Sequence, residues 1–351
     1  MNEFLILTIT GLFSFLISFY VLAILLKKSK KYNIKKANTN GIRWGSQKKP
    51  VSGGFVFVLL FLLSGIMYYM IYKNNILIDI QFIGIYIACI IAFMMGLADD
   101  IISTSPYFKF GAQIFCSLIL IYFNVYINIF ESETLNYLLT VFWIVLLMNS
   151  FNMLDNMDAI TGAVSLVILS GIMFCTLKSV NNFSYSFVII AVIGSYISFL
   201  YYNWNPSKLY MGDNGSQFTG ALLGGLSIMF LWNGEWKADD INVIYKIIPV
   251  IFTFVIPLTD TATVTINRLL KGKSPFIGGK DHTTHFLYYR GLTERQISLF
   301  FLISTLITVS ISVYIINFAK VFLWWHALLI ALFAVVIFLC LYINTKVTQP
   351  K

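Results

Sequence analysis

The sequence predicts an all-helical bundle that crosses a membrane many times, and three observations support this. Of the 351 residues, 58% are hydrophobic and only 11% are charged, whereas a soluble domain carries roughly 25% charged residues. The mean hydropathy is +0.81. The apolar residues gather in runs close to the roughly 20 residues that a helix needs to cross a bilayer. Because backbone groups in lipid have no water to bond, such runs must be helices.

We count about eleven apolar runs of this kind, with ten as the alternative because the fifth and sixth are short. No internal repeat or low-complexity tract divides the chain, so we treat 1–351 as one domain. A lysine cluster follows the first run instead of preceding it, so we expect a retained span and not a cleaved signal peptide. The predicted spans lie near 4–26, 53–72, 78–97, 110–130, 135–150, 160–177, 185–203, 215–233, 244–266, 297–317 and 322–344.

The distribution of Lys and Arg predicts the orientation of the bundle. With eleven spans, 19 of the 24 basic residues fall on one side, in 27–52, 98–109, 204–214, 267–296 and 345–351. Because basic residues concentrate in cytoplasmic loops, we predict that this side is cytoplasmic, with the N-terminus outside and the C-terminus inside. The four cysteines lie in apolar runs, where we expect them to behave as small hydrophobic residues and not as a disulfide or metal framework.

A polar stretch between residues 149 and 162 interrupts the apolar pattern. Asn149, Asn152, Asp155 and Asn156 recur at helical spacing, so a helix continuing from the fifth run would carry amides and a carboxylate along one face. Asp158 follows closely. The stripe predicts a surface that faces a metal or a substrate. The alternative is a polar loop between helices, capped by Asn and Asp.

Paired carboxylates, Asp99 and Asp100, end the third span. Adjacent acids at a membrane border repel each other unless a cation or a phosphate-bound metal offsets their charge. Lys109 lies at the start of the fourth span, so we expect its ammonium group to return to one of these carboxylates or to a lipid phosphate. The pair therefore indicates a cationic partner at this border.

A second acidic turn precedes the eighth span, where Asp213 lies between Gly212 and Gly215. The glycines allow a sharp turn that presents the carboxylate outward. Magnesium takes few protein ligands and keeps waters and phosphate oxygens, so Asp213 with Asn152 or Asp155 would suffice to hold it. The alternative is that Asp213 only caps the following helix.

Ser52, Gly53 and Gly54 open the second span, shortly after Lys49. Ser52 is a candidate helix cap, and the two glycines would let a phosphate approach backbone N–H groups at the helix N-terminus. Lys49 would add positive charge to such a site. The alternative is a basic segment attracted to anionic lipid, and for residues 27–36 we prefer that alternative.

The ninth span and the loop after it carry the last candidate group. An acid inside a span, such as Asp260, is a candidate functional residue, although Arg268 and a neighbouring threonine are alternative partners that would satisfy it. Lys280, His282 and His285 follow in the loop. Because the two histidines are three residues apart, they can share a helical face and donate to phosphate oxygens.

In chain order, the motifs are GG, DD, NxxNxxDNxD, MGDxGS, PxxDT and SPF followed by a His-containing loop. Together, over most of the chain, they resemble the polyprenyl-phosphate N-acetylhexosamine-1-phosphate transferases. The resemblance implies an enzyme that transfers a sugar-1-phosphate from a UDP-sugar to undecaprenyl phosphate and releases UMP. It gives catalytic roles to Asp99, Asp100, Asp155 and Asp158.

The resemblance also implies ligands, partners and a location. The expected metal is Mg²⁺, with Mn²⁺ as the alternative, held by Asp213 and Asn152. The expected partners are a UDP-N-acetylhexosamine, undecaprenyl phosphate and membrane lipid, with no nucleic acid, while a homodimer is left open. The location would be the bacterial inner (plasma) membrane, with a cytoplasmic active site serving cell-envelope glycan synthesis. The residues expected to bind substrate are Lys49, Lys109, Asn149, Asp260, Lys280, His282 and His285.

The chain departs from the family pattern in two places. Many relatives have a His-Leu-His-His run where this chain has Thr284 at the third position, and glycines where it has Asn156 and Ala159. We therefore expect Thr284→His to be tolerated. The missing imidazole and the Ser-Pro-Phe loop favour an N-acetylglucosamine donor over a phospho-N-acetylmuramoyl-pentapeptide donor, which stays an alternative. A secondary transporter is the rival class, but its sites lie near the midplane between repeated halves, and no repeat is visible.

Overall fold

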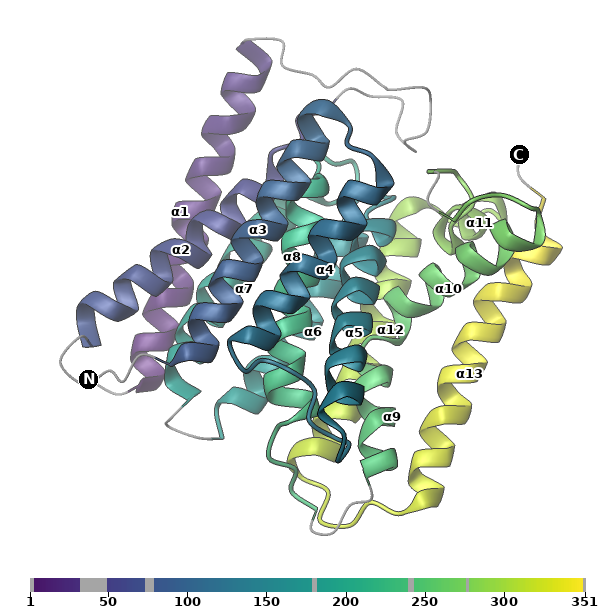
Figure 1. Cartoon of the computed structure of the whole chain (residues 1–351). Coiled ribbons are helices and arrows are strands. Elements are labelled where there is room, and N and C mark those ends of the chain that lie inside the picture. Colours follow the sequence, from purple (N-terminus) through teal and green to yellow (C-terminus); the bar gives the residue numbers. More distant parts are fainter. Residues whose placement is uncertain are drawn as a thin grey trace.

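The computed structural model describes residues 3–31, 49–72, 79–178, 182–238, 243–275 and 278–349. Residues 32–36 of the basic segment and Phe276 of the Ser-Pro-Phe loop lie outside the described residues. Within these ranges the regular elements are helices, and one isolated β-bridge joins Val51 to Tyr210 (Figure 1). The predicted all-helical architecture is confirmed.

Each predicted apolar run corresponds to a helix or a broken helix. Among the described residues, seven helices are long and apolar enough to cross a membrane, or eight if the bent pair α9 and α10 is one span, while α4 and α6 are shorter apolar helices. The chain is therefore a multi-pass membrane protein. The helices are α1 Glu3–Lys31, α2 Gly53–Tyr72, α3 Ile80–Ile102, α4 Pro106–Tyr122, α5 Glu133–Leu154, α6 Ile160–Thr176, α7 Phe183–Asn203, α8 Asp213–Ser227, η2 Ile228–Trp232 (a π-helix), α9 Val243–Thr253, α10 Val255–Leu270, α11 Thr283–Tyr289, α12 Glu294–Asn317 and α13 Trp324–Val347.

The ninth run differs from the prediction because it is broken, with an angle of 82° between α9 and α10. Pro249 lies inside α9 and Pro257 in the first turn of α10. In a continuous helix the nitrogen of Pro257 would have to donate to Thr253, which proline cannot do, and its ring would meet that carbonyl. As a result α10 leaves the direction of α9 and runs toward α11 and the end of α13 (Figure 1).

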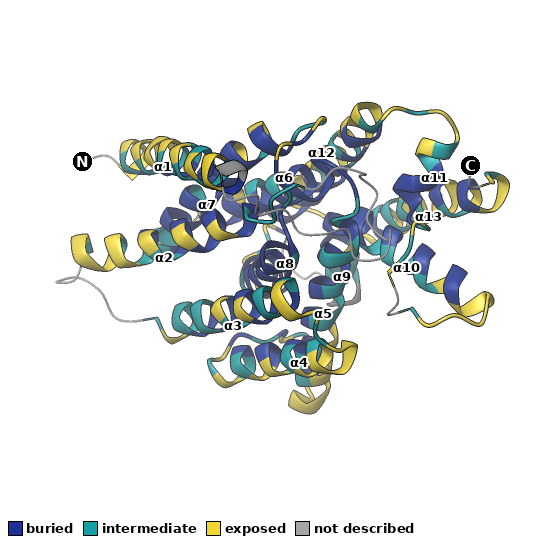
Figure 2. Cartoon of the chain, turned by 90° about the horizontal axis from the view of Figure 1, so that it is seen from above, coloured by how far each residue is buried: buried dark blue, intermediate teal, exposed yellow. Residues whose placement is uncertain are grey.

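α8 lies at the centre of the bundle. Every residue from Asn214 to Ser227 is buried, and α2, α3, α5 and α6 pack around the helix (Figure 2). Its sequence, DNGSQFTGALLGGLS, is rich in glycine and other small residues, which let neighbouring helix backbones approach closely in a membrane. Asp213 is therefore held at the tip of an enclosed helix.

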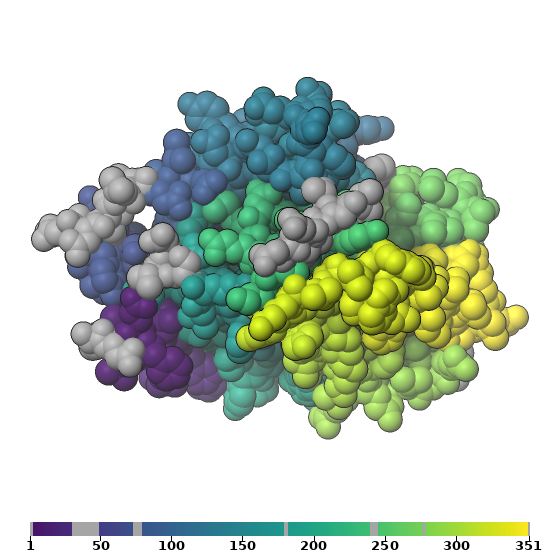
Figure 3. Space-filling view, turned by 90° about the horizontal axis from the view of Figure 1, so that it is seen from below, coloured from purple at the N-terminus to yellow at the C-terminus, as the bar shows by residue number. Residues whose placement is uncertain are grey.

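α1 and α13 lie on opposite flanks of the molecule (Figure 3). Only 17% of the apolar window of α1 and 11% of that of α13 are buried. A large apolar surface of this kind would be a liability in water, but it matches the hydrocarbon that surrounds a membrane-spanning bundle. The exposed faces of these two helices are therefore lipid-facing surfaces.

Ala159, between α5 and α6, lies in the left-handed backbone region with φ of 66°. There the Cβ atom crowds the following carbonyl oxygen, at a cost of roughly 1 kcal/mol or more. We expect Ala159→Gly to remove this strain and to raise the stability of the fold by about 1 kcal/mol. The measurement is the thermal unfolding midpoint of the detergent-purified protein.

Ala163→Gly is the matched control for this prediction. Ala163 is also fully buried, but it lies within α6, where glycine costs about 1 kcal/mol relative to alanine. The same chemical change should therefore lower the midpoint at 163 and raise it at 159. A lower midpoint in both variants would contradict strain at Ala159.

Candidate active site

A cavity of about 1000 Å³ opens among α4, α5, α10, α11 and the loops near them. It collects residues from sequence segments that lie far apart, and most of the predicted site residues line it. Asp99, Asp100, Asp260 and Lys280 are the predicted residues that do not line the cavity. Those that do are Lys49, Lys109, Asn149, Asn152, Asp155, Asp158, Asp213, His282 and His285.

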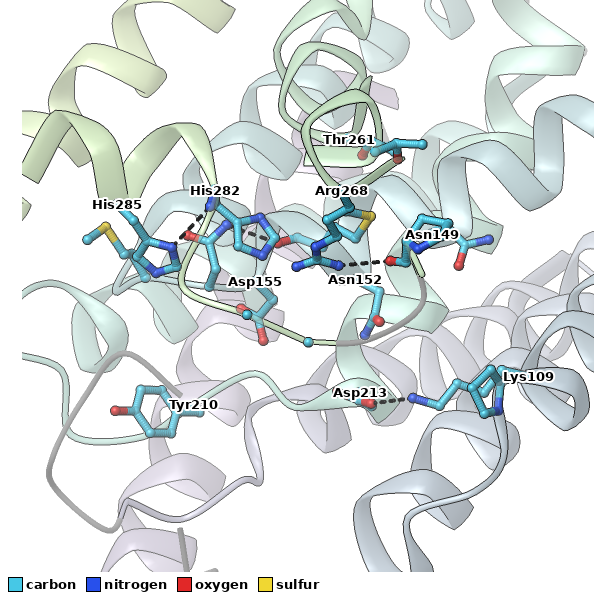
Figure 4. Close-up of a pocket in the computed structure, with 18 of the residues that line it drawn as sticks. Lys109, Asn149, Asn152, Asp155, Tyr210, Asp213, Thr261, Arg268, His282 and His285 are labelled. Atoms are coloured by element: carbon cyan, nitrogen blue, oxygen red, sulfur yellow. Dashed lines mark hydrogen bonds and ion pairs between the residues drawn. The ribbon is translucent and has the colours of Figure 1, made fainter. Parts of the chain in front are cut away.

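The last turns of α5 supply one wall of the cavity. Asn149, Asn152, Asp155 and Asn156 all line it, so the predicted polar stripe is confirmed as a surface of the cavity, although α5 ends at Leu154 and the last two residues follow the helix. Asn152 Nδ2 donates to Ser216 Oγ at 2.9 Å, which ties the stripe to the first turn of α8. In Figure 4, Asp155 and Asn152 lie between the two histidines above them and the Asp213–Lys109 pair below.

Lys109 joins two carboxylates that come from different helices. Its Nζ lies 2.5 Å from Asp99 Oδ2 and 3.2 Å from Asp213 Oδ2. The expected return of Lys109 to the paired aspartates is confirmed, and Asp213 is a further partner. One ammonium group thus faces two carboxylates. A cation is therefore the complementary ligand at this point.

The two paired aspartates have different surroundings. Asp100 Oδ2 accepts hydrogen bonds from the backbone N–H of Asn214 at 3.0 Å and from Asn214 Nδ2 at 2.6 Å, so Asp100 holds the N-terminus of α8. The cap position itself is Gly212, whose φ is 83°, and it makes no side-chain cap bond. The alternative that Asp213 caps α8 is therefore wrong, and its carboxylate lines the cavity instead.

Asp158 and Lys49 meet at one end of the cavity. Asp158 accepts from the backbone N–H of Ser207 at 2.9 Å and from Ser207 Oγ at 2.7 Å. Lys49 Nζ donates to Ser207 Oγ at 2.8 Å, lies 3.6 Å from Asp158 Oδ2 and stands 5.0 Å from the ring centre of Tyr210. These contacts fix the loop after α7 and place a cation over an aromatic ring.

Gly53 and Gly54 do not offer their N–H groups to a ligand, contrary to the prediction. They donate to the carbonyl oxygens of Tyr210 and Met211, both at 3.0 Å, and Ser52 Oγ is buried without making the expected cap bond. A Cβ atom on Gly54 would collide with the tip of α8. The glycines therefore serve close packing of α2 against α8 and not phosphate binding.

Asp260 organises the loop that carries the histidines. The carboxylate is fully buried. It accepts from Thr283 N–H at 2.8 Å, from Thr283 Oγ1 at 2.6 Å and from His282 Nδ1 at 2.8 Å. Because an ionised carboxylate only accepts hydrogen bonds, the proton shared by Asp260 and His282 lies on Nδ1 of His282. Nε2, the other ring nitrogen of His282, does not contact Asp260. The structure thus places Asp260 behind His282 and not in the cavity.

Arg268 has a partner other than Asp260, so the alternative that Arg268 satisfies that acid is wrong. Its Nε and Nη2 donate to the two carboxylate oxygens of Asp281 at 2.8 and 2.6 Å, and Nη1 donates to the Pro275 carbonyl at 2.8 Å. Although burial opposes the shift, the hydrogen bonds from Arg268 lower the pKa of Asp281 below its ordinary value. The bidentate pair closes the loop between α10 and α11.

His285 is a neutral imidazole. Its Nδ1 accepts from the backbone N–H of His282 at 3.2 Å, so the ring proton lies on Nε2. Burial, reinforced by the neighbouring His282, lowers the pKa of His285 to about 3. His285 can therefore donate a hydrogen bond at neutral pH but brings no positive charge.

This shift predicts a pH effect on stability. Since the pKa of His285 falls from 6.5 to about 3 on folding, the unfolded chain binds this proton more readily. The stability from the neutral ring is complete above about pH 6.5 and is lost as the pH falls toward 3. We expect His285→Asn, which keeps an acceptor near Nδ1, to lose less stability than the wild type between about pH 7 and pH 4.5. Parallel falls of the two unfolding midpoints would contradict this.

Several residues of the cavity escaped the sequence reading. Asn205, Tyr210 and Glu294 line it, and so does Arg268, which the sequence suggested only as a partner of Asp260. Asn205 Nδ2 donates to Asp158 and to Glu294, and so links the loop after α7 to the start of α12. An amide before a proline and an acid in the first turn of a helix are ordinary in sequence, so no local signal marked them.

The donor set near Asp213 fits magnesium. Among the described residues, no group of three or more His, Cys, Asp or Glu is placed to hold a metal. Magnesium needs only one or two carboxylates besides waters and phosphate oxygens. Asp213 and Asp99 supply such oxygens next to Lys109, and Asn152 lines the same cavity.

The fold and the cavity together define a multi-pass membrane protein with an internal site lined by charged and amide side chains. Residues 82–231 match the sequence model of glycosyl transferase family 4. The family resemblance predicted from the motifs is thereby confirmed.

Curated relatives give the same result. A probable undecaprenyl-phosphate N-acetylglucosaminyl 1-phosphate transferase of Bacillus subtilis (strain 168) is 28% identical over 247 residues, 68% of this chain and 67% of the relative. A phospho-N-acetylmuramoyl-pentapeptide-transferase of Prochlorococcus marinus (strain NATL2A) is 27% identical over 338 residues, 87% of this chain and 86% of the relative. A decaprenyl-phosphate N-acetylglucosaminephosphotransferase of Mycobacterium leprae (strain TN) is 25% identical, with 58% and 57% covered.

Proposed function

We propose that this protein transfers N-acetylglucosamine-1-phosphate from its UDP-sugar to undecaprenyl phosphate, releasing UMP, as the first membrane step of a cell-envelope glycan. The observation that carries the proposal is the cluster of Asp99, Lys109 and Asp213 beside the polar stripe of α5, in one cavity of a membrane bundle. Relatives whose names state transfer of sugar phosphates to polyprenyl phosphates support it.

Joining two phosphate-bearing substrates requires mainly charge neutralisation and in-line positioning. Lys109, Arg268 and His282 line the cavity and would offer donors to phosphate oxygens. The second pKa of a phosphate monoester is about 6, so the lipid phosphate is largely dianionic at neutral pH and needs little deprotonation. Asp99 is then a group that orients Lys109, with Asp155 facing the reacting phosphates from α5.

Magnesium is the proposed cofactor, with Asp213 and Asn152 as its protein ligands and manganese as the alternative. When bound, it would neutralise phosphate charge. Asp213 is suited to the role because its carboxylate lines the cavity and does not cap α8. Asp100 would act indirectly by fixing Asn214, the residue next to Asp213.

The lipid acceptor needs an apolar approach to this charged site. Phe110, Phe142 and Leu146 line the cavity on α4 and α5, and the first two are exposed on the surface of the bundle. We assign this side to the isoprenoid chain, because a hydrocarbon chain stays in apolar surroundings when it moves from the lipid onto these exposed side chains. The charged side, with Arg268 and His282, is then left for the nucleotide-sugar.

The direct test incubates purified protein with radiolabelled UDP-N-acetylglucosamine, undecaprenyl phosphate and magnesium. We expect one lipid-linked product and an equal amount of UMP. UDP-N-acetylgalactosamine and the UDP-N-acetylmuramoyl-pentapeptide belong in the same series as alternative donors. Product from the pentapeptide donor alone would move the chain to the alternative activity, and no product from any donor would overturn the proposal.

We further propose eleven membrane crossings, with the N-terminus outside and the cavity open to the cytoplasm of a bacterial plasma membrane. Lys237 and Lys280 are both exposed, on opposite predicted sides. In a Cys340→Ser background, which removes the exposed native thiol, an impermeant reagent added to intact cells should label Lys237→Cys and spare Lys280→Cys. Equal labelling would contradict this orientation.

A further inference from the structure

Thr284 and Asn156 connect two walls of the cavity. Thr284 is fully buried, and its hydroxyl donates to Asn156 Oδ1 at 2.6 Å. Asn156 Nδ2 donates in turn to the Met153 carbonyl at 2.9 Å, which ties it to the last turn of α5. We call this contact the Asn156–Thr284 bridge. Thr284→His would replace the hydroxyl of this contact at a fully buried position, so the structure favours impairment over the tolerance expected from the sequence.

The bridge lies next to two groups of the proposed site. Asn156 directly follows Asp155, and Thr284 directly precedes His285. Asp155, Asn156 and His285 all line the cavity, and Asp155 lies below the two histidines in Figure 4. The bond between Asn156 and Thr284 therefore constrains the distance from the Asp155 carboxylate, at the end of α5, to the imidazoles of His282 and His285.

α11 needs an outside constraint to hold that spacing. It has seven residues, too few for a stable helix by itself. It packs on α10, α12 and α13, and Asp260 of α10 holds His282 and Thr283 from behind. The bridge ties the same helix to the opposite wall, at α5.

We propose that the Asn156–Thr284 bridge is a positioning contact that sets the spacing between Asp155 and the His282–His285 pair for the transfer step. This rests on the proposed function. We assign the bridge no contact of its own with phosphate or metal. Its loss should misplace reacting groups, which lowers kcat more than it changes the KM for the nucleotide-sugar.

Thr284→Val removes the donor at nearly unchanged volume, and Asn156→Ala removes the acceptor. Thr284→Ser keeps the hydroxyl. We expect each of the first two to lower kcat roughly three- to tenfold, with KM changed less than about twofold. The double variant should be no worse than the more impaired single one, because both remove one contact. Thr284→Ser should retain most of the wild-type rate.

Thr305→Val is the matched control. Thr305 is equally buried, but its hydroxyl donates only to Phe301 of its own helix, so the same change breaks no link between walls. Amide hydrogen exchange of residues 283–289 is the readout that needs no substrate. Protection should fall by the same factor in Thr284→Val, Asn156→Ala and the double variant, and should stay unchanged in Thr305→Val.

The outcomes separate the two claims. If the wild type is active, then normal kcat in both single variants, or additive losses in the double variant, would overturn the bridge as a positioning contact. If the wild type made no lipid-linked product from any donor, the proposed function would fail. Exchange would then still decide whether the bridge holds α11, and unchanged protection in the single variants would overturn it as well.

Discussion

Asp213→Asn should lower turnover roughly 10²–10³-fold while the protein still folds and can be extracted. The amide keeps the size of the side chain and an oxygen near Lys109, but it loses the negative charge that the proposed magnesium requires. Since Gly212 is the cap position and Asp213 makes no cap bond, the change should leave α8 intact. The measurements are initial rate against magnesium concentration and the thermal unfolding midpoint.

Glu131→Gln is a matched control, because Glu131 is an exposed acid in the short turn before α5. It should keep full activity. Asp100→Asn adds a contrast: it weakens the hold on Asn214, so it should lower the unfolding midpoint as well as the rate. Full activity of Asp213→Asn at ordinary magnesium concentration would exclude Asp213 as a magnesium ligand.

His282→Asn should lower kcat by roughly ten- to a hundredfold. The side-chain amide of Asn can place its N–H where Nδ1 of His282 lies and still donate to Asp260. It has no group in place of Nε2, the other ring nitrogen. Folding should therefore survive while a phosphate contact is lost. The same rate assay and unfolding midpoint measure both quantities.

His326→Asn controls for a histidine-to-asparagine exchange outside the cavity. His326 Nδ1 accepts from the backbone N–H of Leu323 at 3.0 Å at the start of α13, and His326 does not line the cavity. It should change neither rate nor KM. A normal specific activity in His282→Asn, together with a lowered midpoint, would give His282 a structural role only.

The helices could be predicted from the sequence because each apolar run must satisfy its own backbone in lipid. α4, which is 106–122 and not 110–130, illustrates the limit: Ser105 caps it and Pro106 starts it, which are local signals that hydropathy alone does not weigh. The break between α9 and α10 was missed for a related reason. A window of apolar residues looks the same whether Pro257 interrupts the helix or begins a new one.

The candidate site was partly predictable because charged groups in a membrane border need partners. Lys109 could be assigned to the paired aspartates on that argument, and the stripe of α5 followed from helical spacing. Which acid pairs with which base could not be read, since it depends on how segments far apart meet. Thus Arg268 pairs with Asp281, while Asp260 is satisfied by His282 and Thr283.

Asp260 also constrains the order in which the chain can be assembled during synthesis. It lies on α10, inside a strongly apolar pair of helices, but its hydrogen-bond partners come 22 and 23 residues later. An ionised carboxylate without partners is costly in hydrocarbon. A nascent chain that ends before His282 must therefore carry Asp260 protonated or keep α10 near water. The hydrogen bonds of Asp260 can form only after His282 and Thr283 have been synthesised, so this wall of the cavity is completed late in biogenesis.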